Sequence, residues 1–278
     1  MIARHHNENI EFINEDIARY EKAWNEDIVN ALKKRPAENL GPEFREVQSI
    51  MALSIVGQLS KDHVKRYLDI ATHLGIANFE SAMKPGVSFS VNIDGEVVEL
   101  SGTATTAYTD TDTWINAFYC AVIARSSAGI ETLCAVPESI HANSDIKPDN
   151  FDLAFVRMLK GMYNPDVNIG ELLVDAMEKS FPDNFSGARM EYVDNILVPH
   201  ISLYERILSH EPDEFNKDLE DAVLKHRNYW GSKKNKYNSI GWIALPLIGI
   251  AAIAYDNPKI EMGFSTEYIP DWLVRHKF

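Results

Sequence analysis

Large apolar residues recur at helical spacing near the start of the chain. Between residues 9 and 34 they stand three or four positions apart, at Ile10, Ile13, Ile17, Tyr20, Trp24, Ile28 and Leu32. Because an α-helix turns once in about 3.6 residues, this spacing places them on one face of an amphipathic helix. Pro36, Gly41 and Pro42 then predict a break, and a second helix is expected from about Glu43.

Residues 87–100 follow a different pattern, the strict alternation of a half-buried strand. Apolar and polar residues alternate up to Asp94-Gly95, a pair that favours a two-residue type I′ turn. That turn sets Val91 opposite Val98, so the apolar residues of both strands share one face. A β-hairpin is therefore predicted over 87–100, packed on helices because an isolated hairpin is only marginally stable in water.

Helical spacing is typical of the rest of the chain. One helix is expected after Ser60, a favourable N-cap residue, with Gly75 as its C-terminal stop. Beyond the polar stretch 101–112, helical patterns occupy residues 114–123, 130–135, 151–163, 170–181, 190–208, 213–229 and 240–255. No linker is long and polar enough to require two domains. We predict a mainly α, bundle-like single domain over 1–278, with a helical subregion at 1–84, the hairpin at 87–100 and a helical body at 112–278.

The most apolar segment, 237–255, contains no charged residue and follows three lysines, a pattern shared with short membrane spans. Pro246 and Gly249 interrupt it, so we favour a central core helix over 240–255 with Trp242 buried. The first eight residues lack the apolar stretch of a signal peptide, and two cysteines are too few for a disulfide framework. We expect a protein of the reducing cytoplasm, not bound to a membrane.

Charge excludes one class of function and suggests a partner. The 278 residues carry 41 acidic and 27 basic side chains, a net charge of −14. Nucleic-acid binding needs clustered positive charge, so a nucleic-acid partner is not expected. An acidic surface instead suits a basic protein partner.

A search for catalytic chemistry finds weak candidates only. Asp110-Thr111-Asp112 has the form of a metal–diphosphate motif, but it directly precedes a helix, where Asp112 or Thr113 as N-cap explains it better. His5-His6 with Glu8 lies at a terminus, where solvent exposure is the simpler interpretation. Cys120 lies between apolar residues and is expected to be a buried, inert thiol. We predict no catalytic residue, no metal site and no cofactor.

One helical face carries an unusual set of like charges. This acidic stripe consists of Glu211, Glu214, Asp218 and Asp221, at spacings of three, four and three. Like charges at these spacings disfavour a helix slightly, so helix formation alone does not call for them. A solvated face beginning near the positive helix N-terminus is one interpretation, and a surface that contacts a basic partner is the other.

Several C-terminal segments together resemble a known family. They are His-Arg-Asn-Tyr-Trp at 226–230, Ile-Gly-Trp-Ile-Ala-Leu-Pro-Leu at 240–247, Ala-Ala-Ile-Ala-Tyr-Asp at 251–256 and Ser-Thr-Glu-Tyr-Ile-Pro at 265–270. With the Arg…Leu…Val-Pro segment at 125–137, they resemble immunity protein family 49 of bacterial polymorphic toxin systems, over about the last 160 residues. Ile269 replaces the usual leucine, and Asn257-Pro258 replaces a glycine-bearing turn. The physical roles of these glycines and aromatic residues are those of a scaffold.

The resemblance implies a non-enzymatic inhibitor that binds a cognate toxin domain, for which a nuclease is one suitable class. The acidic stripe is the candidate contact surface. Two alternatives stay open at this point: an all-α hydrolase with a dispersed site that uses Asp110, Asp112 and histidines, and a membrane-associated helical protein built on 237–255. The sequence leaves the oligomeric state open.

Overall fold

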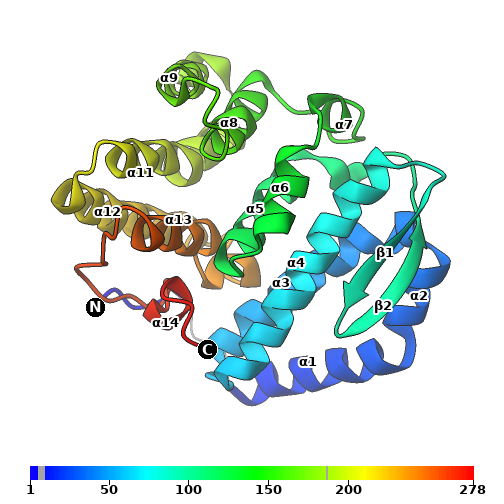
Figure 1. Ribbon diagram of the computed structural model, residues 1–278. Helices are drawn as coiled ribbons and strands as arrows, with labels where there is room; N and C mark the ends of the chain where they lie inside the picture. The colour runs from blue at the N-terminus through cyan, green and yellow to red at the C-terminus, as the bar shows by residue number, and fades with distance from the viewer. Residues whose placement is uncertain (6–9, 186) are drawn as a thin grey trace. The chain divides into compact units, whose positions relative to one another are not determined.

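The computed structural model describes residues 1–5, 10–185 and 187–278. Backbone contacts group the chain into two compact units. The C-terminal unit comprises Met1–His6 and Pro148–Lys277, and the N-terminal unit comprises Asn7–Lys147 with Phe278. Both are mainly α, and the one sheet among the described residues is a two-stranded hairpin (Figure 1). The predicted fold class, mainly α with one β-hairpin, is confirmed, whereas the single-domain organisation stays a prediction.

The N-terminal unit begins with the predicted amphipathic run. Helix α1 (Ile10–Ala23), a π-helical turn (Trp24–Ile28) and α2 (Val29–Lys34) follow one another directly. The buried side chains on its inner face are Ile13, Ile17, Tyr20, Trp24 and Leu32. Over residues 10–34, the part of this run that the structure describes, the helical period therefore identified most of the buried face. The exceptions are Ile10, which is 52% exposed, and Ile28, which is half-buried.

The predicted end of the first helix is confirmed, because α2 ends at Lys34 and Arg35 leaves the helical conformation. The predicted link up to residue 42 is wrong, because α3 (Pro36–Val56) begins at Pro36 and contains Pro42. Proline is tolerated at the first position of a helix, since its missing N–H has no intrahelical acceptor there. A Cβ on Gly41 would lie 2.2 Å from the Cβ of Tyr108. This glycine therefore permits a close packing contact and does not end a helix.

Helix α4 (Lys61–Met83) starts as predicted, with the Ser60 hydroxyl accepting a hydrogen bond from the backbone N–H of His63 at 3.2 Å. The predicted stop at Gly75 is wrong. Gly75 lies buried in the middle of α4, where a Cβ would stand 2.8 Å from the Cβ of Ala117. The residue is small because α4 packs closely on the helix that carries Ala117.

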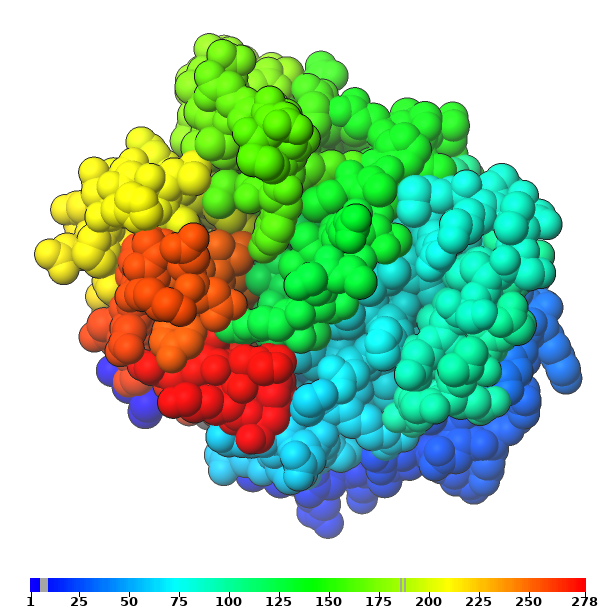
Figure 2. Space-filling view, viewed as in Figure 1, coloured from blue at the N-terminus to red at the C-terminus, as the bar shows by residue number. Residues whose placement is uncertain are grey.

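The hairpin is confirmed in position and register. Strands β1 (Ser88–Ile93) and β2 (Glu96–Ser101) pair antiparallel, with Val91 opposite Val98. Asp94 and Gly95 have φ of 53° and 85°, the left-handed values that a type I′ turn requires. The apolar face is buried, and Figure 2 shows the hairpin (teal) beside α4 (cyan) at the surface, in agreement with the contact between α4 and β1.

The remaining helices of this unit are α5 (Thr111–Ile123), α6 (Ser127–Cys134) and α7 (Glu138–Ala142), after a 3₁₀ turn at Ala107–Thr109. Every residue of α5 except Asp112 and Asn116 is buried. The rings of Trp114 and Phe118 stack with centroids 5.2 Å apart. Helix α5 is therefore a core element of the N-terminal unit.

The longer helices of the C-terminal unit, among its described residues, are α8 (Asn150–Gly161), α9 (Ile169–Lys179), α10 (Gly187–Tyr192) continuing through a π-helical turn (Val193–Leu197) into α11 (Val198–Leu208), α12 (Pro212–Trp230) and α13 (Leu245–Asp256). Short helical turns lie at Pro182–Asn184, Ser239–Trp242 and Asp271–Val274, the last labelled α14. Helix α11 contacts α9, α12 and α13, so it lies at the centre of this unit.

The predicted helix 240–255 is partly wrong, because α13 starts only at Leu245. Pro246 has no N–H to donate to the carbonyl of Trp242, which instead accepts a hydrogen bond from Nε of Arg4 at 2.6 Å. Trp242 is buried as predicted, while Ile240 is 44% exposed. Among the described residues, Ser239–Asp256 is the one stretch apolar and long enough to cross a membrane, and 67% of it is buried inside the protein, as in a core helix.

Candidate functional site

The acidic stripe lies along the first half of α12, and a neighbouring helix neutralises part of it. Arg206 of α11 donates from Nη1 to Glu211 at 2.7 Å and from Nε to Asp218 at 2.9 Å. These two hydrogen bonds raise the pKa of Arg206, and the bond to Asp218 has the larger effect. Glu211 and Asp218 therefore hold α12 against α11 in addition to facing solvent.

The other two members of the stripe are more available to a partner. Glu214 is exposed and lies 3.4 Å from Lys217 on the same helix, an arrangement worth little in stability. Asp221 is exposed, and no ion pair is described for it within the residues that the structure covers. The structure thus keeps all four carboxylates on one side of α12, as predicted, and separates an Arg206-bound pair from an exposed pair.

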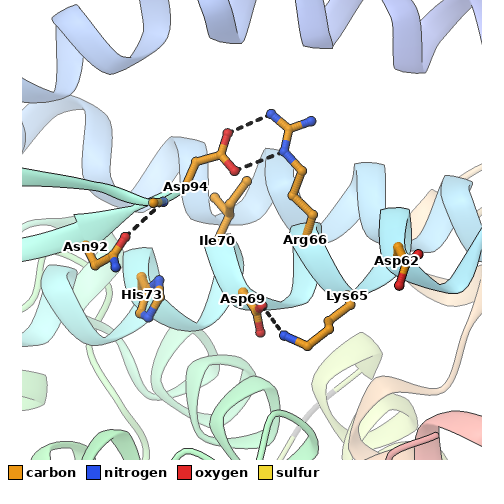
Figure 3. Close-up of a pocket in the computed structure, with 9 residues that line it drawn as sticks. Asp62, Lys65, Arg66, Asp69, Ile70, His73, Asn92 and Asp94 are labelled. Carbon is orange, nitrogen blue, oxygen red and sulfur yellow. Dashed lines mark hydrogen bonds and ion pairs between the residues drawn. The ribbon is translucent and has the colours of Figure 1, made fainter. Parts of the chain in front are cut away.

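A cleft that the sequence did not predict lies in the N-terminal unit, between α4 and the turn of the hairpin (Figure 3). Its volume is about 480 Å³. Charged and polar side chains line it, among them Asp62, Lys65, Arg66, Asp69, His73, Asn92 and Asp94. The polar residues of α4 that line the cleft recur at spacings of three and four, and this is the one sign of it in the sequence. The hairpin residues opposite them are about 20 positions further along the chain, so spacing alone does not bring the two sides together.

The charges around this cleft pair with one another. Arg66 donates to Asp94 from Nε at 2.9 Å and from Nη2 at 2.7 Å, and Nε1 of Trp24 donates to the same carboxylate at 3.1 Å. The hydrogen bond from Arg66 lowers the pKa of Asp94 most, and the charge of Arg66 and the hydrogen bond from Trp24 lower it further. Together they outweigh burial, which raises this pKa. Lys65 pairs with Asp69 at 2.5 Å. The network fixes the hairpin turn to α4 and to the π-helical turn that follows α1.

The candidate catalytic aspartates have structural roles. Asp110 is the N-cap of α5, in place of the predicted Asp112 or Thr113, and its Oδ1 accepts the N–H of Thr113 at 2.6 Å. Arg45 lies 3.5 Å from Asp110 and 4.0 Å from Asp112. Burial, partly offset by these partners, raises the pKa of Asp110. These contacts explain the Asp-Thr-Asp motif as a helix cap tied to α3.

The other chemical candidates also have structural explanations. Among the described residues no cluster of three metal-ligating side chains exists. His6 and Glu8 lie outside the described residues, and His5 is half-buried, with Nδ1 2.7 Å from the hydroxyl of Tyr268, so its predicted solvent exposure is wrong. Cys120 is buried as predicted, and burial raises the pKa of its thiol to about 12. A thiol with that pKa is not a nucleophile at neutral pH.

Residues from the separate C-terminal motifs meet in one cluster. Nε2 of His226 lies 3.0 Å from the carbonyl oxygen of Gly241, and the His226 ring lies 5.1 Å from that of Tyr268. A Cβ on Gly241 would stand 2.4 Å from the indole of Trp230. These four residues are packed against one another and largely buried. Their role is to join α12, the 3₁₀ turn before α13, and the C-terminal tail.

Comparison with known families identifies the class to which this scaffold belongs. The model of the family described as Immunity protein 49 matches residues 58–273, from the end of α3 to α14. The chain belongs to this family. The match extends about 60 residues further toward the N-terminus than the resemblance recognised in the sequence, so α4, the hairpin and most of α5 are part of the family's scaffold. No curated protein and no solved structure matches the chain.

Proposed function

We propose that this chain is a cytoplasmic immunity protein that binds a cognate toxin domain and neutralises it, acting by binding and not by catalysis. Its membership of the Immunity protein 49 family, over residues 58–273, is the observation that supports the proposal. Such proteins protect a bacterium in interbacterial competition from toxins of polymorphic toxin systems. The net charge of −14 suits a basic target, and a nuclease with a basic substrate groove is the target class that we propose.

An inhibitor of a lethal enzyme requires tight binding. A dissociation constant of 1 nM corresponds to about −12 kcal/mol, and stable interfaces bury about 1,600 Å² in total. We propose that the acidic stripe, Glu211, Glu214, Asp218 and Asp221, forms part of this interface. Exposed charges at an interface mainly raise the association rate and make it sensitive to salt.

The structure selects the variants that test the stripe. Asp218 is held by Arg206, so its reversal to lysine would place two cations together and disturb the contact between α11 and α12. Reversal is therefore made at the exposed pair, Glu214→Lys with Asp221→Lys. The matched control is Asp213→Lys with Glu220→Lys, which changes the same charge at the same spacing on another exposed side of α12.

The measurement is the affinity for the product of the neighbouring gene, tested as the cognate toxin, at two salt concentrations. The stripe variant should bind at least tenfold more weakly, about 1.4 kcal/mol, and with a smaller salt dependence. The control should change affinity less than the stripe variant, and both should melt like the wild type because exposed charges contribute little to stability. Equal affinities for the two variants would remove the stripe from the interface. Absence of wild-type binding and of protection from the toxin in cells would refute the immunity function itself.

A further inference from the structure

Helix α9 of the C-terminal unit is amphipathic, yet little of it is buried. Its inner side faces α8 and α11, which it contacts, and Ala176 is the helix's one buried residue. Leu172 from this inner side approaches Gly161 of α8, where a Cβ would stand 2.5 Å from its Cδ1. The helix therefore packs through a narrow line of small and apolar residues.

A second apolar side of α9 is left open to solvent. It is formed by Leu173, Val174, Met177 and Phe181, which we call the α9 apolar face. Val174 and Phe181 are 57% and 56% exposed, and Leu173 and Met177 are half-buried. Their spacing, with Phe181 just beyond the helix end, aligns all four along one side. A contiguous apolar strip of this kind is typical of an interaction surface, in contrast to single exposed apolar residues.

The surroundings of the α9 apolar face are acidic. Glu171, Glu178 and Asp183 are exposed beside it, and no ion pair is described for them within the part of the chain that the structure covers. Asp175, by contrast, is paired with Arg157 and Lys179. An apolar centre with a charged rim is the anatomy of a specific protein interface, in which apolar anchors supply affinity and charges supply selectivity.

The rim also decides between two kinds of occupant. A second copy of this chain would bring two acidic rims together, on molecules that each carry a net charge of −14, so self-association is opposed. A basic partner gains from the same rim. We propose that the α9 apolar face is the docking site for apolar side chains of a basic toxin domain; this inference rests on the proposed immunity function and assigns it an anchoring surface.

This assignment gives the α9 apolar face a different task from the acidic stripe on α12. Burial of apolar side chains lowers the dissociation rate and depends weakly on salt, whereas the stripe acts on the association rate. The two surfaces are therefore distinguishable by kinetics. Removing the anchors should shorten the lifetime of the complex and leave the salt dependence of association unchanged.

The test replaces the two exposed anchors, Val174→Ser with Phe181→Ser. The chain offers a closely matched control, Val87→Ser with Phe12→Ser, because Val87 and Phe12 are 55% and 57% exposed and lie in the N-terminal unit. The probe is the product of the neighbouring gene, tested as the cognate toxin in a catalytically inactive form. We expect the α9 variant to bind at least tenfold more weakly, mainly through faster dissociation, with melting temperature unchanged and with the control binding like the wild type.

Other outcomes overturn the inference in recognisable ways. Wild-type binding with an unaltered α9 variant would refute the docking site and leave the immunity function standing. An equal loss of affinity in the control would show a non-specific effect of removing exposed apolar area. Sedimentation that shows a dimer of this chain, dissociated by Val174→Ser with Phe181→Ser, would assign the face to self-association. If the wild type does not bind the toxin domain, the proposed function fails first and the inference falls with it.

Discussion

Acidification below pH 6.5 should destabilise this protein through its buried residue His226. His226 is 6% exposed, with its ring close to Trp230 and Tyr268. Burial, partly offset by the hydrogen bond to the carbonyl of Gly241, lowers its pKa to about 4, from 6.5 in an exposed histidine. The imidazole is therefore neutral in the folded protein and takes up a proton in the unfolded chain at any pH between these two values.

The sign and size of the effect follow from that difference. Below pH 6.5 the unfolded chain binds a proton that folded His226 does not bind, so the free energy of unfolding falls as the pH falls, until about pH 4. Each pH unit within this window is worth about 1.4 kcal/mol, so His226 alone removes about 2 kcal/mol between pH 7 and pH 5. That is a large fraction of the roughly 5–15 kcal/mol that stabilise a typical domain.

The assay is urea denaturation of the wild type and of His226→Gln at pH 8.5, 7 and 5. Glutamine keeps an N–H donor for the Gly241 carbonyl but has no proton to bind. From pH 7 to pH 5 the wild type should lose about 2 kcal/mol more than the variant, and from pH 8.5 to pH 7 the two should change alike. Groups that do not interact with His226, such as Asp152 with its pKa raised to about 6 by burial, are common to both proteins and cancel in the comparison. His200 does not cancel fully, because its pKa is lowered first by burial and then by His226. An identical loss in both proteins between pH 7 and pH 5 would refute the reasoning.

Two further predictions concern the core and the hairpin. Leu247→Asp should leave little soluble protein, because Leu247 is 2% exposed and an unpaired buried charge costs several kcal/mol. The control Ile240→Asp, at a position 44% exposed, should fold and melt close to the wild type. Equal yields of the two variants would contradict the described start of α13. Asp94→Ala should lower the free energy of unfolding by about 1 kcal/mol more than Asp94→Asn. Both variants lose the charge that pairs with Arg66, but asparagine tolerates the positive φ of the turn better than alanine does. Chemical denaturation measures the two losses, and equal losses would show that the turn conformation contributes nothing.

The sequence determined those features that depend on residues a few positions apart. The face of α1 and α2 that is buried, the cap at Ser60 and the register of the hairpin all follow from such local patterns, and all are confirmed. The placement of four carboxylates on one side of α12 belongs to the same class, because helix geometry alone sets it. The family resemblance also rested on short motifs, and it extends further along the chain than those motifs showed.

Tertiary contacts decided the rest, since they join residues that the spacing along the chain does not relate. Gly75 ends a helix by local preference but lies within α4, where α5 packs closely on it. The carbonyl of Trp242, which Pro246 leaves without an intrahelical donor, finds its partner in the distant Arg4. The cleft beside Asp94 forms only when the hairpin turn reaches α4. Likewise Arg206, which lies on a different helix, binds two of the four carboxylates in the acidic stripe and leaves the other two exposed. Local sequence sets which conformations a segment favours, and packing between distant segments selects among them and creates the surfaces.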